Sequence, residues 1–62
     1  MFSVLISNDG PMVMVCQFPF VEHALAFALD LHKACNVKHT VFVNNDKNEN
    51  VIMLSADERK SN

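Results

Sequence analysis

The most regular hydrophobic pattern in the chain lies in its middle. Across residues 21–35, apolar side chains recur every three or four positions, which is the spacing of one face of an α-helix. Glu22, Asp30 and Lys33 gather on the opposite face when successive residues are placed about 100° apart. The pattern therefore predicts one amphipathic helix over residues 21–35, with Asn36 as its left-handed C-terminal cap.

Four short apolar segments flank this helix, and they are rich in β-branched and aromatic residues. They cover residues 1–6, 12–18, 39–44 and 50–55, and their length and composition are typical of β-strands. Turn-forming residues separate the first two segments, and a polar run separates the last two, so each pair is expected to form a hairpin. Gly10, the only glycine of the chain, is expected to take a positive φ in the first turn.

This order of elements predicts an α+β fold. We expect a ββαββ chain that forms a four-stranded, mainly antiparallel sheet with one helix packed on one face. Residues 1–58 are expected to form a single compact domain, and residues 59–62 a disordered C-terminal tail.

One helix covers only one face of a sheet, and side-chain alternation indicates which residues it covers. The residues expected to meet the helix are Phe2, Val4, Ile6, Val41 and Val43, with Val37 on the same side as the last two. The orientation of the second and fourth strands stays open. The far face retains apolar residues, although a half-exposed antiparallel sheet normally carries polar ones there. We therefore predict an interaction surface that contains Leu5, Met12, Met14, Phe42 and Met53.

The size and composition of the chain favour association. The chain has 62 residues, of which 50% are hydrophobic, and a core of this size rarely supplies more than about 3–5 kcal/mol. Self-association through the open face or a strand edge is the simplest supplement, and a homodimer is the commonest form. A larger host protein is the other partner that we consider.

The charge and the apolar runs count against two classes of partner. The formal net charge is −2, and the five Lys and Arg residues form no basic stripe, so nucleic acid is an unfavoured partner. No run approaches the roughly 18 apolar residues of a membrane span, so we expect no membrane association. The chain has neither the basic nor the long apolar segment of a secretory leader, and we expect a complete cytoplasmic protein.

Candidate chemistry is sparse. The soft metal-ligand side chains that we considered are Cys16, His23, His32 and Cys35. No Cys-x-x-Cys motif is present, and His23 projects roughly opposite Cys35 on the helix, so no metal or other cofactor is predicted. Both cysteines lie in apolar runs, which are typical of buried, unreactive thiols, although their pairing with each other stays open. We predict that the chain is not an enzyme.

A resemblance to one family rests on the segment around the start of the helix. An Asp-Gly hairpin, then Phe18-Pro19 and a helix containing Glu22, Ala24 and Leu25 resemble the layout of small HicB-type antitoxin domains over about half of the chain. The resemblance implies a regulatory, nucleic-acid-linked role. The chain departs from that family because it lacks the glycine-containing loop before the helix and a DNA-binding tail.

The sequence therefore predicts a small, non-enzymatic protein-interaction module that self-associates and acts as a regulator or inhibitor of a larger protein. Two alternatives remain. The first is a nucleic-acid-binding or antitoxin-like regulator that uses an aromatic sheet face. The second is a small enzyme or metal protein with a site built from Cys16, His32 and Cys35 at a dimer interface.

Overall fold

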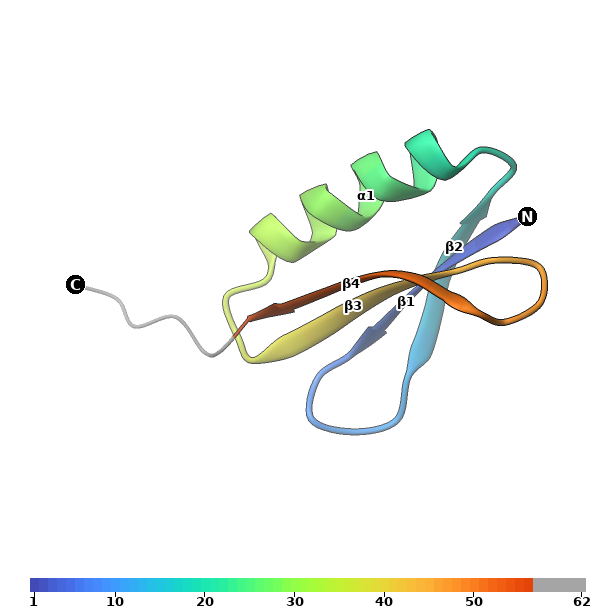
Figure 1. Cartoon of the computed structure of the whole chain (residues 1–62). Helices are drawn as coiled ribbons and strands as arrows, with labels where there is room; N and C mark the ends of the chain where they lie inside the picture. Colours follow the sequence, from blue (N-terminus) through green and yellow to red (C-terminus); the bar gives the residue numbers. More distant parts are fainter. Residues whose placement is uncertain (57–62) are drawn as a thin grey trace.

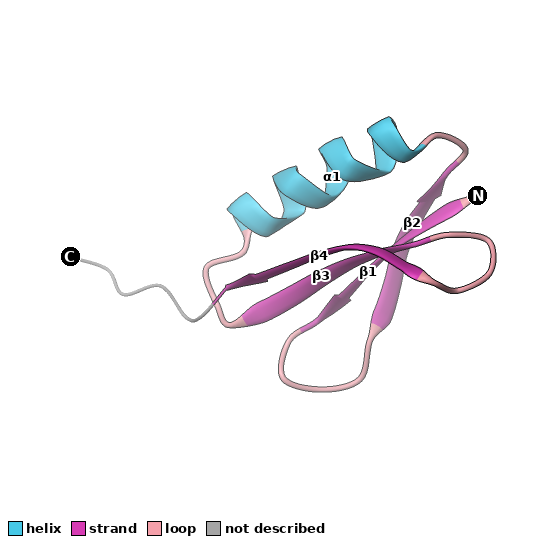
Figure 2. Cartoon of the chain, viewed as in Figure 1, coloured by secondary structure: helices cyan, strands magenta, loops and turns pink. Residues whose placement is uncertain are grey.

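The chain forms one antiparallel sheet with a single helix lying across one of its faces (Figures 1 and 2). The computed structural model describes residues 1–56. Its elements are β1 (Phe2–Ser7), β2 (Val13–Phe18), α1 (Val21–Ala34), β3 (His39–Asn44) and β4 (Asn50–Ala56). The predicted ββαββ order and α+β class are confirmed. The end of the predicted domain at residue 58 and the predicted tail at residues 59–62 lie outside the described residues.

The four strands are arranged in the order β2-β1-β3-β4, and every neighbouring pair is antiparallel. Each hairpin therefore supplies one inner strand and one edge strand. The helix carries the chain from the edge strand β2 across the sheet to the inner strand β3 (Figure 1). This path places α1 over one face of the sheet only.

The core lies between α1 and the face that it covers. Val4, Val41 and Val43 are fully buried there beneath Ala24 and Ala28 of the helix. The small alanine side chains allow the helix to approach the sheet closely, so the valines of the inner strands fill the space between them. Partly buried residues surround this cluster: Phe2, Ile6, Phe18, Phe27, Leu31, Ile52 and Leu54. The five residues predicted to meet the helix are thus confirmed. Val37, which was expected on the same side of the third strand, precedes β3 and is 51% exposed.

The turns differ from the prediction in the residue that takes a positive φ. In the first turn it is Asp9 (φ 62°) and not Gly10. The Ser7 hydroxyl donates a 2.7 Å hydrogen bond to the Gly10 carbonyl oxygen. In the second turn it is Asn48 (φ 61°). Asp and Asn adopt this conformation more readily than other non-glycine residues, so the turns form without glycine at these positions.

The helix ends one residue earlier than predicted. Cys35 has an extended backbone (φ −89°, ψ 121°) and donates its N–H to the carbonyl oxygen of Leu31. Asn36 is not among the described residues with a positive φ, so the predicted left-handed cap is wrong. The chain leaves α1 already extended toward β3, and no left-handed reversal is needed.

Val41 tests the contact between α1 and the sheet. Replacement of Val41 by Ala leaves a cavity under the helix, because the side chain is fully buried. We expect a loss of about 1–3 kcal/mol in the free energy of unfolding, measured by urea denaturation. The control is Val51→Ala, at a side chain that is 45% exposed, for which we expect a change within about 0.5 kcal/mol. Equal losses in both variants would contradict this description of the core.

Candidate interaction surface

The sheet face opposite α1, which we call the open face, carries an apolar row that crosses all four strands. Strand register places Leu5 opposite both Met14 and Phe42, and Phe42 opposite Met53. The four side chains therefore lie side by side in the order Met14, Leu5, Phe42, Met53. We call this set the apolar row. It brings together four of the five residues predicted for the interface.

The exposure of the row follows from strand position. Met14 and Met53 lie on the edge strands and are 55% and 60% exposed, whereas Leu5 and Phe42 lie on the inner strands and are half-buried. Neighbouring strands cover an inner side chain from both sides, while an edge side chain has a neighbour on one side only. The row thus presents two accessible methionines around a less accessible centre.

Uncharged polar side chains border the apolar row on both sides. On one side Gln17, Ser3 and Asn44 lie opposite one another across three strands, and the Gln17 amide donates a 3.0 Å hydrogen bond to the Ser3 hydroxyl. On the other side lie Thr40 and Ser55, with their hydroxyl oxygens 3.4 Å apart. The open face is therefore an apolar strip between two neutral polar strips.

None of the four strands contains Asp, Glu, Lys or Arg. In the part of the chain that the structure describes, these residues lie on the turns, on α1 and in the segment between α1 and β3. A second copy of the face can approach without like-charge repulsion, because neither surface carries a formal charge.

Met12 does not join the apolar row. It was predicted to begin the second strand, but β2 begins at Val13 and Met12 lies in the preceding turn, 53% exposed. A further difference lies within β2, where Val4 pairs with Cys16 and Leu5 with Met14. Val15 is thus an extra residue, a β-bulge that reverses side-chain alternation. As a result, Cys16 pairs across the covered face while Met14 lies on the open face.

The other edge strand, β4, also contains a bulge. In β4, Ile52 pairs with Val43 and Asn50 with Asn44, which leaves Val51 as an extra residue. Edge strands that lack charges are prone to pair with other chains, and a bulge opposes this by interrupting the regular ladder. Both edges of this sheet carry such an interruption. The open face is therefore better suited to association than either edge.

The candidate ligand side chains do not form one cluster. Cys16 and Cys35 are free thiols, and both are half-buried rather than buried as predicted, because β2 is an edge strand and Cys35 lies at the helix end. His23 is exposed at the start of α1. Its ring is edge-on to that of Phe20, and the two ring centroids are 5.6 Å apart. Among residues 1–56, no group of three or more His, Cys, Asp and Glu side chains could hold a metal ion.

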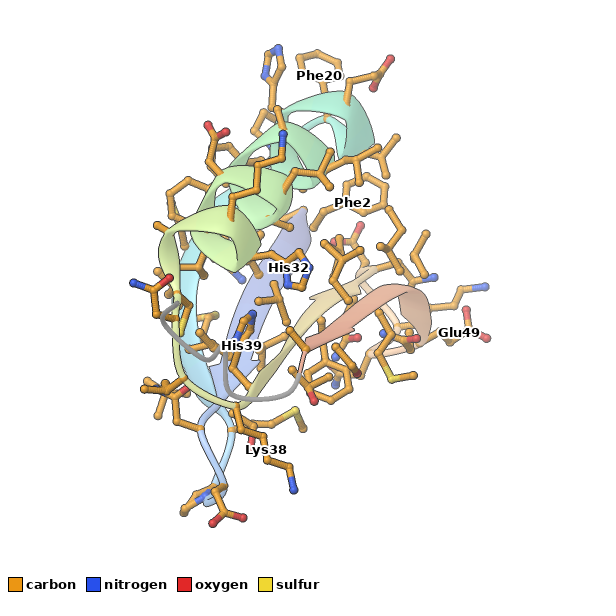
Figure 3. The ribbon with its side chains drawn as sticks, turned by 90° about the vertical axis from the view of Figure 1, so that its left-hand side faces the viewer. Phe2, Phe20, His32, Lys38, His39 and Glu49 are labelled. Carbon is orange, nitrogen blue, oxygen red and sulfur yellow. The ribbon has the colours of Figure 1, made fainter. Side chains whose placement is uncertain are left out.

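His39 is the one residue of chemical interest that the sequence interpretation missed. It is 2% exposed, and its Nε2 atom lies 2.8 Å from Nδ1 of His32 (Figure 3). The signal was present in the strand pattern, because alternation places His39 on the same face as Val41 and Val43. An open depression of about 280 Å³ adjoins it, lined by Lys38, His39, Thr40, Ser55 and Ala56.

Comparisons of the chain with protein-family models, with curated proteins and with solved structures found no match. Within the described residues, no helix has both the length and the apolar character that crossing a membrane requires.

The surroundings of the cysteines predict ordinary thiol reactivity. The Sγ atom of Cys16 lies 3.8 Å from the carbonyl oxygen of Gln17, and that of Cys35 lies 4.0 Å from the carbonyl oxygen of Val37. Carbonyl oxygens do not activate a thiolate. We expect both thiols of the native protein to react with a disulfide reagent more slowly than in the denatured chain. The single variants Cys16→Ser and Cys35→Ser show which thiol gives which reaction rate. A thiol that reacts faster in the native state than in the denatured chain would contradict the prediction.

Proposed function

We propose that the chain is a small, non-enzymatic interaction module of the cytoplasm that self-associates through its open face. The observation that carries the proposal is the apolar row of Met14, Leu5, Phe42 and Met53, which crosses the whole sheet on the side without a helix. Contiguous apolar surface of this kind marks association surfaces in small proteins. The two free thiols agree with a reducing compartment.

A second copy of the chain is the partner that fits best. Two sheets pack face to face about 10 Å apart, with the apolar residues of both inner faces interdigitating. A twofold axis through the open face would place each apolar row against its own copy. Methionine at both ends of the row supports this packing, because its flexible side chain adapts to irregular gaps. The absence of formal charge on the described strands removes the electrostatic obstacle.

The size of the face sets the expected strength. Four strands of about six residues cover roughly 20 Å by 20 Å, given a strand spacing of about 4.8 Å and a rise of about 3.3 Å per residue. The flat area of such a face, roughly 400 Å², is below the about 600–1,000 Å² that each partner buries in a stable specific interface, and smaller interfaces are weak and transient. We therefore expect a dissociation constant in the micromolar range, of about 1–100 µM. A dimer of this strength would exchange readily, which suits a regulator or inhibitor that transfers its open face to a larger protein.

The other two classes receive less support. A sheet that stacks nucleic-acid bases needs accompanying basic side chains, and the described strands contain none. An enzyme built from Cys16, His32 and Cys35 would need them in one place. Cys16 lies on β2, whereas His32 and Cys35 lie at the far end of α1.

Substitutions at two adjacent residues of β2 distinguish association through the open face from association through the strand edge. Met14 lies on the open face and Val13 on the opposite side of the same strand, and they are 55% and 61% exposed. We expect Met14→Lys to raise the dimer dissociation constant at least about tenfold, because dimer formation would bury the new charge within the apolar row. Val13→Lys is the matched control, and its dimer dissociation constant should stay within about twofold of the wild-type value.

Sedimentation equilibrium over micromolar concentrations measures both variants. An effect of Val13→Lys equal to that of Met14→Lys would indicate edge pairing instead. A wild-type chain that stays monomeric at high micromolar concentration, and binds no apolar dye, would refute the proposed function.

Phe42 tests the centre of the row. We expect Phe42→Lys to abolish association while far-ultraviolet circular dichroism retains the helix signal, because the side chain is half-buried on the face away from α1. Phe20→Lys is the control, since Phe20 is 59% exposed beside the start of the helix, and it should leave association unchanged. Loss of the helix signal in Phe42→Lys would identify Phe42 as a core residue and contradict the interface.

A further inference from the structure

Two histidine rings meet at the end of the sheet that lies beneath the last turn of α1. His32 belongs to that turn and His39 is the first residue of β3. The ring centroids are 4.9 Å apart, and Nδ1 of His32 lies 2.8 Å from Nε2 of His39. Figure 3 shows both rings between the end of the helix and the strand. His39 is the only buried polar or charged residue among those described.

The hydrogen bonds determine where the protons of this pair lie. Nδ1 of His39 is 2.7 Å from the carbonyl oxygen of Val37. A carbonyl oxygen accepts and never donates, so Nδ1 carries the hydrogen and donates it. In the neutral ring, Nε2 of His39 is then an unprotonated acceptor aimed at His32. A proton on Nδ1 of His32 completes the short contact between the rings.

We propose that His32 Nδ1 and His39 Nε2 form a binding site for a divalent transition-metal ion such as Zn²⁺, in place of the proton between them. Neutral imidazole nitrogen is a preferred ligand of Zn²⁺, Ni²⁺ and Cu²⁺. When the ion binds, the proton leaves Nδ1 of His32 and Nε2 of the same ring takes one up, so a neutral pair releases no net proton. The ion exchanges one shared hydrogen bond for two metal–nitrogen bonds.

The hydrogen bond from Nδ1 of His39 is of the kind that orients metal-ligating histidines. A ligating histidine almost always donates its other ring N–H to a carbonyl or carboxylate, which holds the ring in the correct tautomer and orientation. The Val37 carbonyl accepts this hydrogen bond here, and the His39 side chain is 2% exposed. His39 therefore offers a fixed lone pair before any ion arrives. His32 is half-buried, so the ion reaches the pair from the His32 side.

The geometry requires a small adjustment. Two zinc–nitrogen bonds of about 2.0–2.1 Å at a tetrahedral angle separate the nitrogens by roughly 3.3 Å. The present separation is 2.8 Å. Rotation of the half-buried His32 ring opens the gap, while His39 stays in place. Water fills the remaining coordination positions.

The expected affinity is modest. Two protein ligands hold an ion far less tightly than the four of a structural zinc site. Lys33 and Lys38 are sequence neighbours of the pair, and their positive charge opposes the approach of a dication. We expect one Zn²⁺ per chain with a dissociation constant of about 1–100 µM.

Isothermal titration of the full, untagged chain with ZnCl₂ tests the site. We expect His32→Gln to weaken zinc binding at least about tenfold. His23→Gln is the matched control, because His23 is an exposed histidine at the opposite end of the same helix, and it should leave the affinity within about twofold. In nitrogen-15 spectra, zinc should shift the signals of His32 Nδ1 and His39 Nε2 and leave those of His23 unchanged.

Three results would overturn the proposal: no binding at millimolar Zn²⁺, binding that His32→Gln leaves intact, or binding that His23→Gln removes. His39→Asn is a second variant that tests the buried ligand, with circular dichroism as the check on its fold. If it unfolds, the nitrogen-15 shifts of the wild type decide. This proposal is independent of the interface, because the histidine pair lies on the covered face of the sheet.

Discussion

The contact between two alanines of the helix and three valines of the inner strands is the constraint on which the rest of the structure depends. Ala24 and Ala28 lie directly over Val4, Val41 and Val43, and these five are the fully buried hydrophobic residues described. Small side chains on the helix and branched side chains on the sheet pack closely together, and this packing fixes which face of each strand is covered. The other face is not covered by a helix, because α1 is the one helix within residues 1–56.

The open face follows from that constraint. The described strands carry apolar side chains on both faces, but the helix covers only one of them. The uncovered side chains do not scatter, since strand register aligns Met14, Leu5, Phe42 and Met53 in one row. The bulges in β2 and β4 make each edge irregular, which favours contact through the face over addition of strands at the edge.

The same crossover that covers one face also creates the histidine pair. The chain leaves α1 with an extended residue at Cys35 and turns directly into β3, so the last turn of the helix lies over the first residue of the strand. His32 and His39 are seven residues apart and meet at 2.8 Å. The Val37 carbonyl, within the connecting segment, completes the arrangement by accepting the hydrogen bond from the ring of His39.

The sequence by itself determined the element types and the sides of the inner strands. The helical spacing of Ala24 and Ala28 and the alternation of Val41 and Val43 are local properties, so they can be read without knowledge of any contact. Leu5 and Phe42 were placed on the open face for the same reason. Local composition gave the turns as well, but not whether Asp9 or Gly10 would adopt the positive φ.

Only the tertiary structure decided the strand order, the side of Met14 and the partner of His39. Pairing determines where a bulge forms, and the bulge at Val15 reverses the alternation on which a sequence interpretation relies. Likewise, the contact between His32 and His39 exists only after the helix has docked, because the docking angle and not the spacing brings the rings together. The local sequence pattern therefore determines the helix and the strands, whereas long-range contacts determine the apolar row on the open face and the His32–His39 pair.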